Sequence, residues 1–201
     1  ARLPEASRGR VVQLDLRARG ITDYGELKVR GFGQPAAPPT LELYFDGQPM
    51  TLARWPNEGF VGIRELVQPG SRADGTPSVI GYLDDRHARW TQAEDPWIFG
   101  YFHFLWADAT ARIGSIDPEA KTLTTAEPYH YGGRGMDPQQ GIIYHAFNLL
   151  EEIDRPGEWY LNRNTGVLYF YPPSDPNRAT VEIGLLDVPM ITMNGDRKSV
   201  V

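Results

Sequence analysis

The sequence predicts an all-β fold, a compact domain that resembles a β-barrel or β-sandwich, and three observations support this. The 201 residues include 17 Pro and 21 Gly, and 11% of them are aromatic. Such a composition is typical of short strands separated by frequent turns. The segment 157–173 alternates on its first arm, turns at Asn164-Thr165-Gly166 and ends at Pro172-Pro173, so it predicts a β-hairpin. Its second arm, Val167–Tyr171, is apolar on both faces and is therefore expected in a core.

Charge and cysteine content exclude several classes of function. The net charge is −6, and the basic residues are scattered, which argues against nucleic acid or an anionic membrane as partner. The absence of cysteine excludes disulfides, thiolate metal sites and cysteine nucleophiles. No apolar run approaches the roughly 20 residues that span a bilayer. Ala1–Pro4 is followed by no apolar region, so no signal peptide is predicted in this sequence. Because the chain begins at Ala1 without Met, we expect it to be a piece of a longer protein.

The remaining elements follow from alternation and turn chemistry. Two further hairpins are expected, one around Asp46-Gly47 and one around the turn at residues 117–120. Residues 70–77 are polar and are expected to form an exposed loop. The predicted strands are Val11–Leu16, Lys28–Phe32, Leu41–Phe45, Met50–Trp55, Ser78–Leu83, Arg86–Gln92, Asp108–Ile116, Lys121–Thr125, Thr180–Leu186, Val188–Met193 and Ser199–Val201.

Two segments leave alternatives open. Residues 142–152 carry apolar side chains at a helical spacing, and a strand followed by a short helix also fits them. The segment Asp95–Trp106 is rich in aromatic residues, which favours core packing, although a platform for stacking sugars is the alternative. The glycine-rich loop Tyr129–Gly135 lacks the strand-then-helix context of a phosphate cradle.

The sequence holds no catalytic constellation. A glycosidase needs two carboxyl groups on opposite sides of one bond, but the adjacent pairs found here are expected on the solvated surface. These pairs are Asp84/Asp85, Glu94/Asp95 and Glu151/Glu152. The histidines lack metal-binding spacing, and no serine has a nucleophile-elbow context, so we predict neither metal nor cofactor. The histidines are His87, His103, His130 and His145.

The strongest candidate for substrate binding is Arg54-Trp55-Pro56-Asn57. An aromatic face beside a guanidinium and an amide is what a sugar ring and its hydroxyls use. We therefore predict Arg54, Trp55 and Asn57 as substrate-binding residues. The alternative is that Trp55 is buried at the end of a strand.

Several blocks of the sequence resemble right-handed parallel β-helix proteins similar to glycoside hydrolase family 141. The first block is Leu41–Phe60. Further blocks follow in the same order, so the resemblance covers nearly the whole chain. They are Gly100–Phe102 with Trp106–Asp108 and Ser115–Pro118, then Asn148–Ile153 with Pro156–Leu161.

The resemblance implies a domain division and a location for the chemistry. Residues 1–180 are similar to a β-rich insertion domain, and residues 181–201 to the start of a truncated parallel β-helix, with Pro189–Gly195 in its first resumed coil. Members of the family act on plant-type polysaccharides, as α-L-fucosidases or xylanases, outside the cytoplasm. Their catalytic acids lie on later coils. No catalytic residue is therefore carried over, and we expect the isolated chain to be inactive.

Three functions remain open from the sequence. The first is a non-catalytic insertion domain of a bacterial extracellular or periplasmic β-helix glycoside hydrolase, which shapes the substrate cleft or caps the solenoid. The second is a carbohydrate-binding module. The third is a structural or interaction domain of a non-enzymatic β-helix surface protein. The expected partners are an oligo- or polysaccharide and the rest of the β-helix in cis.

Overall fold

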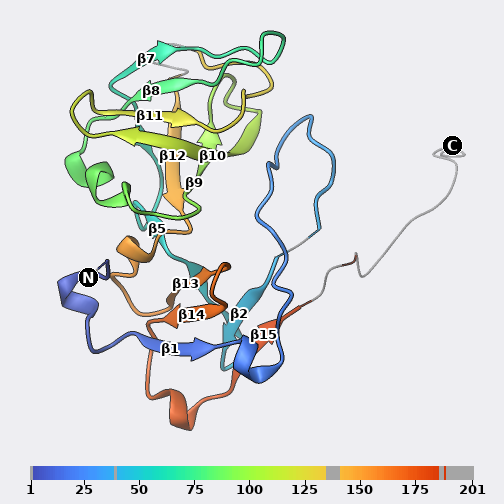
Figure 1. Ribbon diagram of the computed structural model, residues 1–201, viewed down its shortest axis with the longest axis vertical. Coiled ribbons are helices and arrows are strands. Elements are labelled where there is room, and N and C mark those ends of the chain that lie inside the picture. The colour runs from blue at the N-terminus through green and yellow to red at the C-terminus, as the bar shows by residue number, and fades with distance from the viewer. Residues whose placement is uncertain (1, 39, 135–140, 186–187, 189–201) are drawn as a thin grey trace, which may run out of the picture.

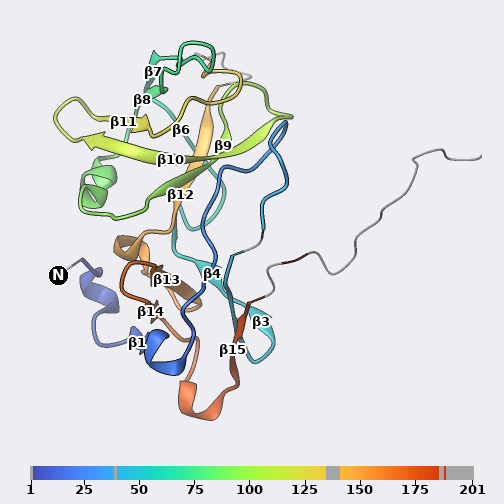
Figure 2. The same ribbon diagram turned by 45° about the vertical axis from the view of Figure 1, so that its right-hand side comes forward.

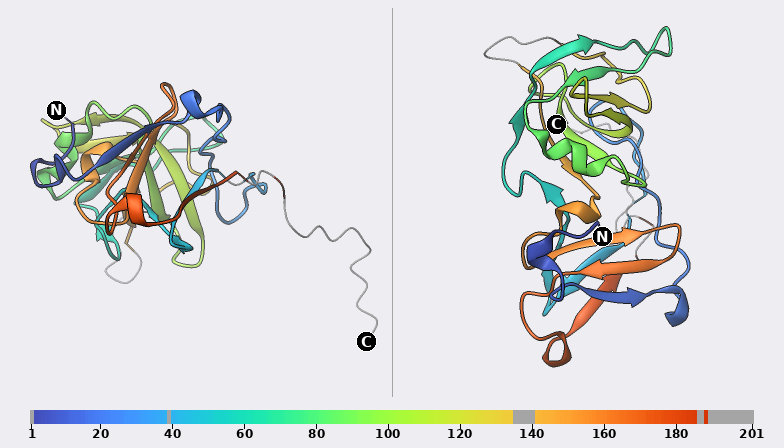
Figure 3. Two further views of the ribbon diagram at one scale, coloured as in Figure 1. Left: turned by 90° about the horizontal axis from the view of Figure 1, so that it is seen from below. Right: turned by 60° about the vertical axis from the view of Figure 1, so that its left-hand side comes forward.

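The computed structural model describes residues 2–38, 40–134, 141–185 and 188, and it confirms the all-β fold. The strands form two lobes, one above the other in Figure 1, and none of the sheets in the described segments closes into a barrel. The N-terminal segment lies beside the junction of the lobes (Figure 3). No helix among the described residues has the length and apolar character needed to cross a membrane.

The lower lobe is a sandwich of two small sheets. In the first sheet β13 runs parallel to β4 and antiparallel to β14, and β14 is antiparallel to β1. Its strands, in order, are β1 (Val12–Asp15), β14 (Val167–Phe170), β13 (Glu158–Asn162) and β4 (Thr51–Leu52). The second sheet is entirely antiparallel and consists of β15 (Val181–Gly184), β2 (Glu42–Phe45) and β3 (Gln48–Pro49).

The hairpin predicted at residues 157–173 forms the centre of this lobe. Trp159 pairs with Phe170, and the ring of Phe170 packs 5.9 Å from that of Phe45 on the facing sheet. On the other face of the hairpin, Tyr160 and Tyr171 join a separate buried cluster. Both faces of the hairpin are therefore covered, as the apolar second arm predicted.

The upper lobe is an eight-stranded sheet, and its longest strand is β10 (Asp108–Asp117). A β-bulge between Ile113 and Ser115 divides β10, so that its first half pairs with β9 and its second half with β11. The path through the sheet is β5 (Arg54–Trp55), β12 (Ile143–Phe147), β9 (Trp97–Tyr101), β10, β11 (Thr122–Thr125), β8 (Val79–Gly81) and β7 (Glu65–Gln68), with β6 (Val61–Gly62) also beside β12.

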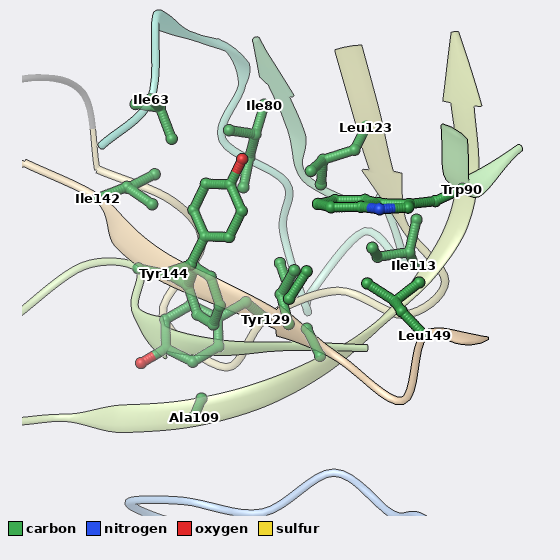
Figure 4. Close-up of a cluster of buried hydrophobic side chains, with 14 residues drawn as sticks. Ile63, Ile80, Trp90, Ala109, Ile113, Leu123, Tyr129, Ile142, Tyr144 and Leu149 are labelled. Carbon is green, nitrogen blue, oxygen red and sulfur yellow. The ribbon is translucent and has the colours of Figure 1, made fainter. Parts of the chain in front are cut away.

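The two ends of this curved sheet are close in the chain. The strand β6 pairs with β12, and after only Ile63 and Arg64 the chain continues as β7 at the opposite edge. Ile63 points into the same core as Trp90 and Tyr144 (Figure 4). The curved sheet therefore wraps one continuous hydrophobic core.

Residues 142–152 form a strand followed by a short helix, so the continuous helical interpretation is wrong and the alternative is correct. Tyr144 and Ala146 alternate with half-buried neighbours and are themselves buried in the upper core. Asn148, with φ of 60°, ends the strand, and the 3₁₀ helix η4 (Leu150–Glu152) follows.

The strand predicted at Arg86–Gln92 is also wrong, because this segment is the 3₁₀ helix η3 (Asp85–Trp90). The side chain of Asp84 accepts a hydrogen bond from the backbone N–H of Arg86 and so caps the helix. His87 and Trp90, three residues apart, are both buried. The repeat of three matches 3₁₀ geometry, in which such side chains eclipse each other.

Two other predictions are correct only in part. Asp46-Gly47 turns the hairpin with φ of 48° and 72°, but its second arm is β3 alone, and the chain then leaves for β4 and β5. Residues 28–32 are not a strand; they touch β10 through one bridge between Gly31 and Ala109. Figure 2 shows this segment rising along the upper lobe.

Most remaining elements agree with the sequence. The strands β1, β8, β11 and β15 lie within their predicted ranges, β10 extends one residue beyond its range to Asp117, and residues 70–77 are mostly exposed. Three short 3₁₀ helices complete the structure: η1 (Glu5–Ser7), η2 (Arg17–Arg19) and η5 (Pro176–Arg178). The elements predicted over 189–201, including the coil at Pro189–Gly195, lie outside the described residues.

Close packing of β9 against β12 depends on a glycine. A Cβ atom at Gly100 would lie 2.1 Å from the carbonyl oxygen of Ile143. We expect Gly100→Ala to lower the free energy of unfolding by about 1–3 kcal/mol, because the two strands must separate. Gly62→Ala in β6 is the control, since nothing lies within 4 Å of that position. Urea unfolding measures the free energy of unfolding of both variants. Equal stability of the two would contradict the close packing of β9 against β12 at Gly100.

Candidate functional site

The structure does not bring the three predicted substrate-binding residues together on one surface. Arg54 pairs with Phe147, and Trp55 pairs with Ala146, so the alternation of β5 places Arg54 and Trp55 on opposite faces of the sheet. The side-chain amide of Asn57 donates to Oδ1 of Asp154 at 2.8 Å. The contiguous motif is therefore divided among three environments.

Trp55 is half-buried on the inner side of the sheet. Its ring lies 5.2 Å from that of His87 and 5.8 Å from that of Trp90. It also lines a mostly apolar pocket of about 260 Å³. The other lining residues are Val61, Gly62, Leu83, Asp84 and His87. Trp55 is thus neither fully buried nor on an open platform.

Arg54 lies on the outer face and shapes the loop at residues 56–60. Its Nε donates to the carbonyl oxygen of Pro56 at 2.9 Å, and its Nη2 to that of Gly59 at 2.6 Å. Phe60 follows directly and is 41% exposed. Arg54 therefore positions this aromatic side chain through the backbone of the loop.

Phe60 belongs to a strip of aromatic side chains that the sequence motif did not include. The strip follows the outer face of β9 and β12, because the register sets Phe99 beside His145 and Trp97 beside Phe147. The ring of Phe60 lies 5.8 Å from that of Tyr101 and 5.5 Å from that of His145. We define the aromatic strip as Phe60, Trp97, Phe99, Tyr101, His145 and Phe147.

A second aromatic group lies beyond β9, in the loop that leads to β10. Trp106 is 59% exposed, stacks on Phe104 with a centroid distance of 4.9 Å, and meets the edge of Phe32 at 4.9 Å. Tyr131 packs 5.5 Å from Phe104. We call Phe32, Phe104, Trp106 and Tyr131 the tip cluster.

Core packing is confirmed for part of the aromatic segment Asp95–Trp106, and the platform for stacking sugars stays a prediction for its outward residues. Ile98 and Phe102 lie in the upper core, whereas Phe99 and Tyr101 are half-buried on the outer face and Trp106 is exposed. The period of two already separates the two sets in the sequence. The residues of the aromatic strip lie outside the motif at residues 54–57, and this alternation in the sequence could have identified them.

The carboxylate pair Glu151/Glu152 is buried, so its predicted place on the solvated surface is wrong. The two side chains are 3% and 0% exposed. Arg2 donates to Glu151 at 2.6 Å, and Arg86 donates to Glu152 through Nε at 2.7 Å and Nη2 at 2.5 Å. These arginines supply the opposite charge that a buried carboxylate needs.

Glu152 is the centre of a polar network at the junction of the lobes. The indole N–H of Trp90 donates to its Oε1 at 2.7 Å, while Arg86 also donates to Asp154, which binds Asn57. Burial raises the pKa of Glu152, and the bonds from Arg86 and Trp90 oppose that rise. Asn57 therefore serves the junction rather than an open surface.

The other two carboxylate pairs lie nearer to solvent. Asp84 and Asp85 are exposed, and Asp85 forms an ion pair with Lys121 at 2.6 Å. Glu94 is exposed, and Asp95 is half-buried and accepts a bond from the indole N–H of Trp97 at 2.9 Å.

Two histidines are held neutral by their surroundings. Burial lowers the pKa of His87 to about 4, and its Nε2 lies 2.6 Å from the hydroxyl of Tyr144. Burial, and then the charge of Arg54, lower the pKa of His145 to about 4. Within the described parts of the chain, no three His, Asp or Glu side chains are arranged to hold a metal ion.

Comparison with known proteins adds one finding. No family model matches the sequence, and no curated protein matches it. Among solved structures, the chain is similar to one described as a glycoside hydrolase, with a TM-score of 0.55 and 15% sequence identity. The fold is similar to part of that structure.

This likeness covers 84% of the present chain and 31% of the other protein. The chain thus spans about a third of that protein's length. At this level of identity the comparison is evidence of a similar fold alone. The chain matches only part of a larger molecule.

A buried acid beside the junction network makes stability depend on pH. Burial raises the pKa of Glu158 from 4.5 to about 7. Between these values the folded state keeps a proton that the unfolded state has lost, so this contribution is full below pH 4.5 and is lost as the pH rises through 7. From pH 5 to pH 8 the loss amounts to about 2–3 kcal/mol.

We expect Glu158→Gln to remove this loss. One oxygen of Glu158, Oε2, accepts the backbone N–H groups of Asp154 and Arg155 at 2.9 and 3.1 Å, and an amide oxygen can accept the same two bonds. Urea unfolding at pH 5 and pH 8 should show that the free energy of unfolding of the variant, relative to that of the wild type, is higher at pH 8 than at pH 5. Glu119→Gln, on an exposed turn, controls for the change in net charge. An unchanged difference at both pH values would contradict the assignment.

Proposed function

We propose that this chain is a non-catalytic insertion domain of a parallel β-helix glycoside hydrolase that acts on plant-type polysaccharides outside the cytoplasm. In this proposal residues 1–180 form the insertion domain and residues 181–201 begin the β-helix. The domain binds the polysaccharide on its aromatic strip and so forms one wall of the substrate cleft. The observation that carries the proposal is the continuous row of rings on the outer face of β9 and β12.

The strip has the properties that carbohydrate binding requires. Sugar rings present patches of C–H groups that pack on aromatic faces, while their hydroxyls need polar groups at the margin. Five of the six rings stand on the paired strands β9 and β12, and Phe60 stands on the loop that Arg54 holds, so the rings are fixed before a ligand arrives. Arg112, exposed beside Trp97 in the β9–β10 register, supplies a polar margin.

The comparison supports the glycoside hydrolase part of the proposal at the level of fold. A domain matching part of a longer glycoside hydrolase is what an insertion into such a protein would give. The fucosidase- or xylanase-like specificity and the β-helix in cis rest on the sequence resemblance. The engagement of Glu151 and Glu152 by arginines also supports a non-catalytic role, because a general acid must be free to exchange its proton with substrate.

A stand-alone carbohydrate-binding module is the second candidate, because the aromatic strip is built entirely from described residues of this chain. Its sites are the strip and the pocket beside Trp55. A structural domain of a non-enzymatic surface protein would need neither. Variants at the two sites separate these possibilities.

Truncation of the exposed ring in the strip should weaken binding. We expect Phe60→Ala to reduce affinity for xylo-oligosaccharides or fucosylated oligosaccharides about 10- to 30-fold, which corresponds to about 1–2 kcal/mol of lost apolar contact. Isothermal titration calorimetry measures the change. Val67→Ala, which removes an apolar side chain from β7 that is 53% exposed, is the control.

Trp55→Ala tests the alternative site in the same assay. Loss of binding in Trp55→Ala with full binding in Phe60→Ala would move the site to the inner pocket and overturn the strip. Binding by neither the wild type nor any variant would favour a cap without a carbohydrate site.

The 201-residue chain should bind polysaccharide without cleaving it. We expect no release of reducing sugar from xylan or fucosylated glycans under conditions in which binding is saturated. A reducing-end assay with a long incubation measures this, and a known xylanase provides the positive control. Turnover by the purified chain, unchanged after a second chromatographic step, would contradict the non-catalytic assignment.

A further inference from the structure

We propose that a polar pocket at the junction of the two lobes binds the carboxylate of an acidic sugar, with Arg163 as the residue that contacts it. The chemical class of ligand is an oligosaccharide that carries a hexuronate unit. This inference rests on the proposed function, because the pocket adjoins the aromatic strip and would receive one substituent of a chain bound there.

The pocket has a volume of about 210 Å³ and takes its walls from both lobes. At this size it can hold one small group or one sugar ring, less than the space that drug-sized ligands occupy. The upper lobe contributes Glu94, Asp95, Arg112 and Asn148, and the hairpin of β13 and β14 contributes Tyr160, Leu161, Arg163 and Asn164.

Arg163 reaches this pocket with an incomplete set of partners. Its Nε donates to the carbonyl oxygen of Gly25 at 3.2 Å, and its Nη1 to Oδ1 of Asn148 at 3.5 Å. Its Nη2 is buried and has no hydrogen-bond partner. Both existing acceptors are neutral, and no ion pair to Arg163 is present within the described segments.

A buried guanidinium without an ion pair is costly for the protein. Burial lowers the pKa of Arg163, and the charge of Asp95 opposes this fall without reversing it. A carboxylate oxygen placed at Nη2 would supply both the absent acceptor and the absent charge. Charge-assisted hydrogen bonds of this kind are roughly twice as strong as neutral ones, so a carboxylate fits the site better than a hydroxyl.

The two acids that line the pocket are already engaged elsewhere. Glu94 accepts bonds from the side-chain amides of Asn162 at 3.1 Å and Asn164 at 2.9 Å, and it pairs with Arg2 at 3.5 Å. Asp95 accepts from the indole of Trp97 and lies 3.8 Å from Nε of Arg112. These contacts partly offset the negative charge of the two acids and leave Nη2 of Arg163 without an acceptor, so a ligand carboxylate must displace neighbouring side chains to reach this buried atom.

The strip leads directly to the pocket. Phe147 and the largely buried Trp97, 4% exposed, form its last pair, and the nearby positions Asp95 and Asn148 line the pocket. Arg112 is paired with Trp97 and lines the pocket as well. A sugar chain stacked along the strip therefore ends with a substituent at the polar pocket.

The test compares a neutral xylo-oligosaccharide with the same oligosaccharide bearing one glucuronate. We expect the acidic probe to bind the wild-type chain about tenfold more tightly, and Arg163→Met to abolish this gain while leaving affinity for the neutral probe unchanged. Arg178→Met, which removes an 88% exposed guanidinium on η5, is the matched control and should keep the gain. Circular dichroism of each variant verifies the fold.

A measurement on the unmodified protein makes the test independent of folding defects. Addition of the acidic probe should shift the guanidinium NMR signals of Arg163, whereas the neutral probe should not. Equal affinity for the two probes, without these shifts, would overturn the pocket and leave the proposed function intact. Failure of the neutral probe to bind would overturn the strip, while Arg163 shifts with the acidic probe would still support the pocket.

Discussion

The structure depends on the compensation of one fully buried charge, that of Glu152. This carboxylate is 0% exposed at the point where the chain leaves the upper lobe, and Arg86 and Trp90 from η3 satisfy it. Arg86 extends the network to Asp154, which binds Asn57. Removal of one partner from such a set leaves an uncompensated charge and commonly costs about 3–5 kcal/mol. The network therefore favours one relative placement of the lobes, and the polar pocket between them exists only in that placement.

The second constraint is the alternation of side chains on β9 and β12, which separates stability from recognition within the same few residues. Ile98 and Tyr144 point inward and are completely buried, whereas Phe99 and His145 stand outward beside each other. Because Gly100 allows the two strands to approach closely, the outward rings form a continuous surface. A one-residue shift of register would send the outward set into the core, so the core itself holds the recognition surface in place.

Local signals in the sequence predicted the strands well, and long-range contacts explain where they failed. The hairpin at residues 157–173 needed only alternation and an Asn-Thr-Gly turn, and both are local. The helix η3 was predicted as a strand although its cap from Asp84 is local, since the burial of His87 and Trp90 that fixes its orientation depends on distant parts of the chain. The functional motif Arg54-Trp55-Pro56-Asn57 was treated as one surface although strand periodicity already divides it. Burial of the pair Glu151/Glu152 could not be foreseen, since its arginine partners lie at positions 2 and 86.

The division of the surface between two lobes has a consequence for binding. The rings of the strip belong to the upper sheet and keep their geometry for as long as that sheet is folded. Arg163 belongs to the lower hairpin, and its distance from Arg112 and Asn148 is set by the junction. Conditions that weaken the junction network, such as protonation of its carboxylates, would thus affect recognition of the acidic substituent before recognition of the neutral backbone of the polysaccharide. The apolar and the ionic contributions to affinity consequently depend on different parts of the fold. A longer ligand that engages both sites would hold the two lobes in their relative placement more firmly than they are held in the free protein.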